Sequence, residues 1–271
     1  MNQVLLEVEG LTQRFGGIIA NNNINFKVYK NSITALIGPN GAGKTTVFNC
    51  VTGFYHATAG HIHLYNEEGQ RQHTIAKLLT RPFNGGSHLV SRIGIARTFQ
   101  NIRLFQDMTV LENLLVAQHR QLDSNLLRGM LASSTFEQRE QEGVDRAMEW
   151  LKRLHLENDA NRLAGELPYG RQRRLEIARA MCTNPRLICL DEPAAGLNPA
   201  ETEHLAELIF LLRDQYQTTV LLIEHDMSLV MDISDHVIVL DHGEVIADGT
   251  PEQVRQDPQV IAAYLGTEII T

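Results

Sequence analysis

The chain has 271 residues with 43% hydrophobic and 21% charged residues, a composition typical of globular rather than disordered proteins. Its formal net charge of -8 would repel a nucleic-acid backbone, so we expect no nucleic-acid partner. The three cysteines have no paired spacing, which favours free thiols in the cytoplasm over a disulfide framework or a zinc site. We find no secretory signal, and the apolar runs are far shorter than the ~20 residues of a membrane-spanning helix.

The N-terminal part of the chain is predicted to contain strands and one helix. Alternating apolar residues around Leu6 and Phe26 predict two strands on either side of a turn rich in Gly and Asn. The apolar run Ile33–Ile37 predicts a buried strand, and the spacing over 44–51 predicts a helix closed by Gly53. The polar stretch 66–97 is predicted to be a loop with one short helix over 75–79.

The second half is predicted to return from helices to alternating strands and helices. From Val110 to about residue 163, apolar residues recur at helical spacing with no strand-like alternation, which predicts an inserted helical lobe. Helices are then predicted over 175–181 and after Asn198-Pro199, and buried strands over 187–190, 219–223 and 237–240. A hairpin turn over 241–243 completes the predicted α/β protein.

The segment between the third predicted strand and the first helix has the pattern of a phosphate-binding loop. It reads Gly38-Pro39-Asn40-Gly41-Ala42-Gly43-Lys44-Thr45, followed by Thr46. Glycines at these positions let successive N–H groups surround phosphate oxygens of ATP, which bulky side chains would block. Lys44 would reach the β- and γ-phosphates, and the Thr45 hydroxyl would ligate Mg²⁺. About one chain in a hundred would match by accident, but the strand-to-helix context argues against accident.

Two adjacent acids, Asp191 and Glu192, follow the predicted strand 187–190. Asp191 would hold Mg²⁺ directly or through water, and Glu192 would polarise the water that attacks the γ-phosphate. The alternative is that both acids only cap the helix that follows.

In these motifs and their order, the chain resembles the ATP-binding cassette family from Leu5 to about Leu265. The resemblance implies that Gln100 contacts Mg²⁺ and the attacking water, and that adenine stacks on Phe15. It also implies that His225 hydrogen-bonds the γ-phosphate and helps to position the water of Glu192. Alternatively, Gln100 is a solvated surface residue, Phe15 belongs to the core and His225 has a structural role.

The family's signature sequence is altered in this chain. Pro168 and Tyr169 stand where the family has serine and its first glycine, so the chain lacks the serine hydroxyl that would contact ATP of the opposite subunit. Gly170 is retained, and we expect helix N–H groups and Arg171 to bind that nucleotide instead. Asn198 replaces the more common aspartate, either as a helix cap or as a link between subunits.

The resemblance also implies the domain organisation. We expect one ATPase domain over 5–253 with the fold of an α/β P-loop NTPase, and a C-terminal helix and tail over 254–271. Its mixed β-sheet core lobe would span about 5–97 and 165–250, with an N-terminal antiparallel β-subdomain and an α-helical subdomain inserted at about 98–164.

The chain is similar to ATPases from branched-chain amino acid importers in four stretches, 38–50, 97–105, 192–199 and 249–266. The implied partners are a second ATP-binding subunit, identical or related, two integral membrane permeases and, indirectly, a periplasmic binding protein. The chain would then lie at the cytoplasmic face of the inner membrane, with Leu104 and Phe105 either at the permease interface or in the core. An exporter ATPase for lipid or polysaccharide, and less so an ATPase of DNA maintenance, remain alternatives.

Overall fold

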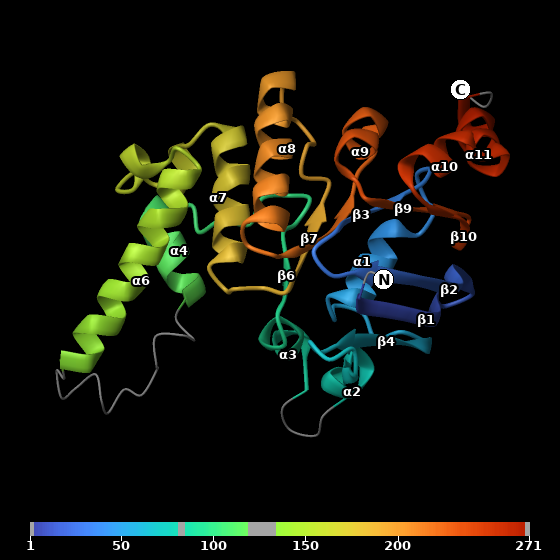
Figure 1. Ribbon diagram of the computed structural model, residues 1–271, viewed down its shortest axis with the longest axis horizontal. Coiled ribbons are helices and arrows are strands. Elements are labelled where there is room, and N and C mark those ends of the chain that lie inside the picture. Colours follow the sequence, from blue (N-terminus) through green and yellow to red (C-terminus); the bar gives the residue numbers. More distant parts are fainter. Residues whose placement is uncertain (1–2, 81–84, 119–133, 269–271) are drawn as a thin grey trace.

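The computed structural model describes residues 3–80, 85–118 and 134–268, and it contains two sheets (Figure 1). The antiparallel sheet has the order β2-β1-β4-β5 and the second sheet has the order β10-β9-β3-β8-β7-β6, in which only β10 runs antiparallel to its neighbour. The strands are β1 Val4–Phe15, β2 Ile18–Tyr29, β3 Ile33–Ile37, β4 Ala59–Tyr65, β5 Arg71–Thr74, β6 Ile95–Arg97, β7 Leu187–Asp191, β8 Thr219–Ile223, β9 His236–Asp241 and β10 Glu244–Gly249.

Helices cover the larger sheet, and two of them form a group at one end of the molecule. Figure 1 shows α4 and α6 at that end, with the antiparallel sheet towards the other. The helices are α1 Lys44–Val51, α2 Ile75–Leu79, α3 Ser87–Arg92, α4 Val110–Gln118, α6 Ser134–Arg153, α7 Tyr169–Met181, α8 Pro199–Asp214, α9 Met227–Ile233, α10 Pro251–Gln256 and α11 Pro258–Glu268, with short 3₁₀ turns at Glu157–Asp159 and Ala164–Glu166. None of the helices in the described ranges is long and apolar enough to cross a bilayer.

The central parallel strands are buried on both faces, which explains their unbroken apolar sequences. In β3, Ile33, Ala35 and Ile37 join a core cluster that includes residues of α7, α8 and α9. Leu36 points to the other face and joins the cluster formed with α1 and the antiparallel sheet. The phosphate-loop segment therefore begins at the end of a strand held from both sides.

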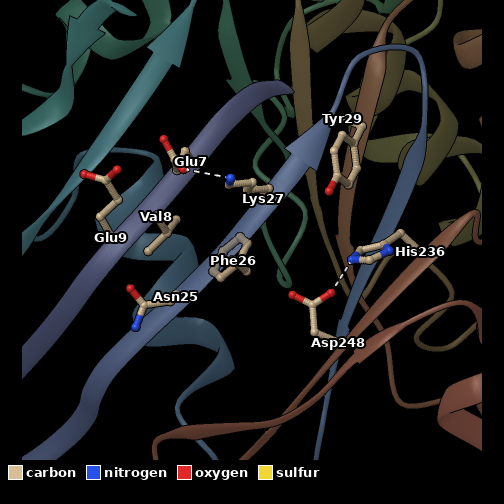
Figure 2. Close-up of a pocket in the computed structure, with 9 residues that line it drawn as sticks. All are labelled: Glu7, Val8, Glu9, Asn25, Phe26, Lys27, Tyr29, His236 and Asp248. Carbon is tan, nitrogen blue, oxygen red and sulfur yellow. Dashed lines mark ion pairs between the residues drawn. The ribbon is translucent and has the colours of Figure 1, made fainter. Parts of the chain in front are cut away.

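The two sheets also approach each other around a hollow of about 350 Å³ beside β1, β2, β9 and β10 (Figure 2). Its charges are paired: Lys27 Nζ lies 3.3 Å from Glu7 Oε1, and His236 Nε2 lies 2.5 Å from Asp248 Oδ1. The Tyr29 ring packs edge-on against His236, with 5.8 Å between the ring centroids. The contact between Tyr29 and His236 joins the antiparallel sheet to the last hairpin of the larger sheet, whereas each of the two ion pairs lies within one sheet.

Two local predictions were wrong. The predicted Gly- and Asn-rich turn is much shorter, because β1 and β2 stay paired up to Phe15 and Ile18, and Asn21, Asn22 and Asn23 belong to β2. Register shifts accommodate this part of the pair, where Asn23 has a φ of 52° and its N–H donates to Thr12 Oγ1.

The stretch 66–97 is more ordered than the predicted loop. It contains the expected helix α2, but also β5, α3 and β6. The three-residue strand β6 is defined by pairing with β7, which lies ninety residues away in the sequence, so local sequence gives little sign of it. Helices α4 and α6 fall within the predicted helical subdomain, and the cysteines are free and buried as expected.

A candidate nucleotide site at the carboxyl ends of the strands

The phosphate-loop residues connect β3 to α1 through backbone that favours glycine. Gly38 has a φ of 147°, and a Cβ there would lie 2.0 Å from the carbonyl oxygen of Leu240. Gly43 has a φ of 95°, and its Cβ would lie 2.4 Å from the Asn21 side-chain nitrogen. The loop thus packs its backbone directly against β9 and β2, and α1 begins at Lys44 with its N-terminus directed at the loop.

The Lys44 ammonium lies over this loop. Its Nζ donates to the carbonyl oxygens of Gly38 and Pro39, at 2.8 and 3.0 Å. Burial lowers the pKa of Lys44, while the negative charge of Glu192 opposes that shift. The lysine is therefore held at the loop, where its charge interacts with that of Glu192.

The acid pair at the end of β7 has two different environments. Asp191 ends the strand and is buried, and its Oδ2 lies 2.7 Å from Arg97 Nη2. Glu192 has a φ of 47°, an uncommon value for a residue other than glycine, and its N–H donates to the carbonyl oxygen of Ile223. Neither acid caps the next helix, because Asn198 forms the N-cap of α8 and accepts from the Glu201 N–H.

Two residues predicted from the sequence, Gln100 and His225, converge on one carboxylate oxygen of a third, Glu192. Gln100 Nε2 donates to Glu192 Oε2 at 2.8 Å, and His225 Nδ1 lies 3.9 Å from the same oxygen. They follow β6, β7 and β8, whose carboxyl ends lie along one edge of the parallel sheet. A glutamine, a glutamate and a histidine at one point can hold and deprotonate a water molecule.

Two charged residues that sequence reasoning left without a role support this arrangement. Arg97 donates to Asp191, to Asn49 Oδ1 at 2.6 Å and to Thr52 Oγ1 at 3.1 Å, which ties β6 and β7 to the end of α1. The sequence shows Arg97 as a charged residue directly after the apolar pair Ile95 and Ala96, which could have indicated a buried ion pair. Its partners could not be identified from the sequence.

Glu224, the second of them, directly follows β8 and is 1% exposed. Its Oε1 accepts from the Ala194 N–H at 2.7 Å, and its Oε2 accepts from the His225 N–H at 3.2 Å. Burial raises the pKa of Glu224, and the N–H donors partly offset this. Glu224 thereby connects the loop after Glu192 to the loop that carries His225.

The predicted adenine contact, Phe15, is 44% exposed, so the core alternative for it is wrong. Its ring packs edge-on against Tyr55, with 5.3 Å between the centroids. An aromatic face at the surface can stack on a nucleobase, and the contact itself stays a prediction.

The altered signature lies at the first turn of α7. Pro168 is the N-cap residue and provides no side-chain cap. A Cβ on Gly170 would lie 2.3 Å from Glu201 Oε1, so α7 approaches α8 closely at this point. Arg171 is paired with Asp159 at 2.6 Å and its side chain is 44% exposed. Arg171 is therefore directed at the helical insertion within this chain, and its contact to a partner's nucleotide stays a prediction.

Comparison with known proteins agrees with this geometry. A family profile described as ABC transporter matches residues 21–195, which include the phosphate loop, Gln100, α7 and the acid pair. The chain belongs to the ABC transporter family of ATP-binding proteins. The predicted ABC ATPase fold and ATPase activity are thereby confirmed. A second profile, described as Branched-chain amino acid ATP-binding cassette transporter, matches residues 244–269.

Three similar ABC proteins cover almost the whole chain. The high-affinity branched-chain amino acid transport ATP-binding protein BraF of Pseudomonas aeruginosa is 54% identical, over 98% of this chain and 99% of its own. The protein of the same description named LivG, of Escherichia coli K12, is 53% identical with the same coverage. A crystal structure of an ABC transporter's ATP-binding cassette in its ADP conformation has a TM-score of 0.78 and 32% identity, over 97% of this chain and 99% of that one.

Proposed function

We propose that this ABC ATPase hydrolyses ATP at Glu192 to power a membrane importer of branched-chain amino acids. The observation that supports the catalytic part is the convergence of Gln100 and His225 on the Glu192 carboxylate. The substrate class is supported by the names of BraF and LivG and by the profile match over 244–269. The exporter alternative has no comparable support.

The hydrolysis step follows from the positions of these side chains. The ATP phosphates lie in the loop 38–45, with Lys44 beside the γ-phosphate and adenine on Phe15. Glu192 takes a proton from a water molecule whose oxygen bonds to the γ-phosphorus, and the bond to the bridging oxygen breaks to release ADP and phosphate. Gln100 and His225 hold that water in line.

A magnesium ion fits the donor set at this place. Thr45, Gln100 and Asp191 offer the oxygen ligands that Mg²⁺ prefers. One Asp191 oxygen accepts from Arg97, so the carboxylate is held in a fixed orientation with its other oxygen as the ligand or as the acceptor for a bound water. When bound, Mg²⁺ neutralises charge on the β- and γ-phosphates.

Complete sites form between two ATP-binding subunits. The first turn of α7, with Gly170 and Arg171, would face the nucleotide held by the partner's phosphate loop. The partner is a second copy or a related subunit, and ATP stabilises the closed pair until hydrolysis. Two integral permeases would hold this pair at the cytoplasmic face of the inner membrane, where a periplasmic binding protein delivers the amino acid on the opposite side.

An exposed apolar groove suits the contact with a permease. It has a volume of about 600 Å³ and is lined by the segment after Gln100 and by α4 and α7. Phe105 and Val116 are 48% and 43% exposed, whereas Leu104 is partly buried against the core. Phe105 is therefore available for a permease interface, whereas Leu104 belongs to the edge of the core. We infer that a permease helix inserts its apolar side chains here.

Phe105→Glu is expected to lower co-purification with the permeases at least about tenfold, because it removes an exposed aromatic side chain from the groove. The loss of one aromatic anchor at an interface is enough for a change of this size. Ile261→Glu is the control, because Ile261 is similarly exposed, at 45%, but lies on α11. Pull-down from membranes expressing both permeases measures the effect. Equal recovery of the two variants would rule out this groove as the docking site.

A further inference from the structure

A fully buried ion pair lies on α7, outside the catalytic groups already described. Arg173 and Glu176 are 0% and 1% exposed at their side chains, and Arg173 Nη1 lies 3.0 Å from Glu176 Oε2. Burying two charges is unfavourable unless further hydrogen bonds satisfy them. The remaining partners of the two side chains therefore indicate what the pair holds.

Those partners are backbone groups of one short segment that contains Gln100. Arg173 Nη1 donates to the carbonyl oxygen of Phe99 at 2.6 Å, and Nη2 donates to the carbonyl oxygen of Gln100 at 2.7 Å. Glu176 Oε1 accepts from the Arg103 N–H at 3.1 Å. The planar guanidinium provides two donors in a fixed fork, which a lysine ammonium does not. Three backbone groups between 99 and 103 are thus fastened to α7.

The same segment connects two functional surfaces. Upstream, the Gln100 side chain donates to Glu192. Downstream, Arg103 and Phe105 line the groove described above, and Phe105 is held to α4 by the Asn113 side chain at 2.9 Å. Arg173 Nη2 also donates to the Tyr169 hydroxyl in the first turn of α7, at 3.0 Å. The ion pair therefore lies at the junction of the groove, the signature turn and the glutamine that contacts Glu192.

We propose that Arg173 and Glu176 are positioning residues. By fixing backbone groups of the segment 99–103 to α7, they hold the Gln100 side chain against Glu192. The proposal rests on the proposed roles of Gln100 and Glu192. A purely structural pair would affect stability without acting through Gln100.

The first test is the double substitution Arg173→Met with Glu176→Met in the full chain. Replacing both charges by side chains that fill the space avoids leaving one buried charge unpaired, so the variant is expected to fold. We expect kcat for ATP to fall at least about tenfold with KM changed less than about threefold, because misplacement of a catalytic side chain affects the transition state more than binding. Arg173→Lys is expected to give an intermediate kcat, since one ammonium reaches the carbonyls without the fork.

The matched control is Arg186→Met. Arg186 is a half-buried arginine that donates to Gln72 at 3.1 Å and to the Tyr65 carbonyl, beside the opposite end of β7. We expect this variant to lower the thermal midpoint without lowering kcat more than about twofold, because it lies away from the site. A fall in kcat equal to that of the double variant would overturn the proposal.

A mutant cycle with Gln100→Ala then separates positioning from structure. If Arg173 and Glu176 act only through Gln100, adding their substitutions to Gln100→Ala lowers kcat by less than about twofold more, which is strong non-additivity. If the two effects multiply, the positioning proposal is wrong. If Gln100→Ala itself leaves kcat unchanged, the failure lies in the proposed catalytic role of Gln100, and the proposal falls with it.

Discussion

Glu192→Gln is expected to lower ATP turnover by about 10²–10⁴-fold while ATP binding is retained. The amide cannot accept a proton from water, but it has the size of the carboxylate and can still accept from Gln100 Nε2. Because hydrolysis no longer reopens the closed pair, the variant should accumulate as a dimer in ATP. Phosphate release and size-exclusion chromatography with and without ATP measure the two effects.

Glu252→Gln is the control for this experiment, because Glu252 is an exposed carboxylate in the first turn of α10. It should hydrolyse ATP at the unsubstituted rate and show no additional dimer. Normal turnover by Glu192→Gln would show that another group is the base. Loss of nucleotide binding together with turnover would instead show that Glu192 serves the binding of ATP.

Arg97→Met is expected to lower the free energy of unfolding by about 3–5 kcal/mol. The side chains of Arg97 and Asp191 are 9% and 5% exposed, so removing the guanidinium leaves the Asp191 charge buried without its counter-charge. The links to Asn49 and Thr52 at the end of α1 are lost as well. Urea unfolding followed by circular dichroism measures the change.

Two further variants check the cause of that loss. Arg97→Met combined with Asp191→Asn removes both charges and should recover most of the stability. Arg213→Met removes two solvent-exposed ion pairs, with Asp214 and with Asp235, whose carboxylate side chains are 56% and 43% exposed, and should cost less than about 1 kcal/mol for each pair. A similar small cost for Arg97→Met would contradict the role of Arg97 as the counter-charge of Asp191.

Features encoded in short contiguous segments could be predicted from the sequence. The residues that determine these elements are adjacent in the sequence: glycines at fixed spacing in the loop 38–45, unbroken apolar runs in β3, β7 and β8, and the cap residue Asn198 before α8. The resemblance to the ABC family led us to expect that Gln100, Glu192 and His225 act together, and the structure explains why they meet, because parallel strands end at the same edge of a sheet.

The supporting contacts depend on pairings between distant parts of the chain. Arg97 and Asp191 are 94 residues apart, and Arg173 and Phe99 are 74 residues apart. A single sequence shows which of these residues are charged, but not which distant partner each one contacts. For the same reason β6 could not be predicted, since its three residues form a strand only by pairing with β7.

The direct measurement of the central claim is ATP hydrolysis by this chain assembled with its permeases in liposomes. We predict that hydrolysis rises when a branched-chain amino acid binding protein loaded with leucine is added, that leucine then enters the liposomes, and that Glu192→Gln abolishes both. Hydrolysis that is indifferent to the loaded binding protein, or that responds instead to a lipid substrate, would contradict the assignment to amino acid import.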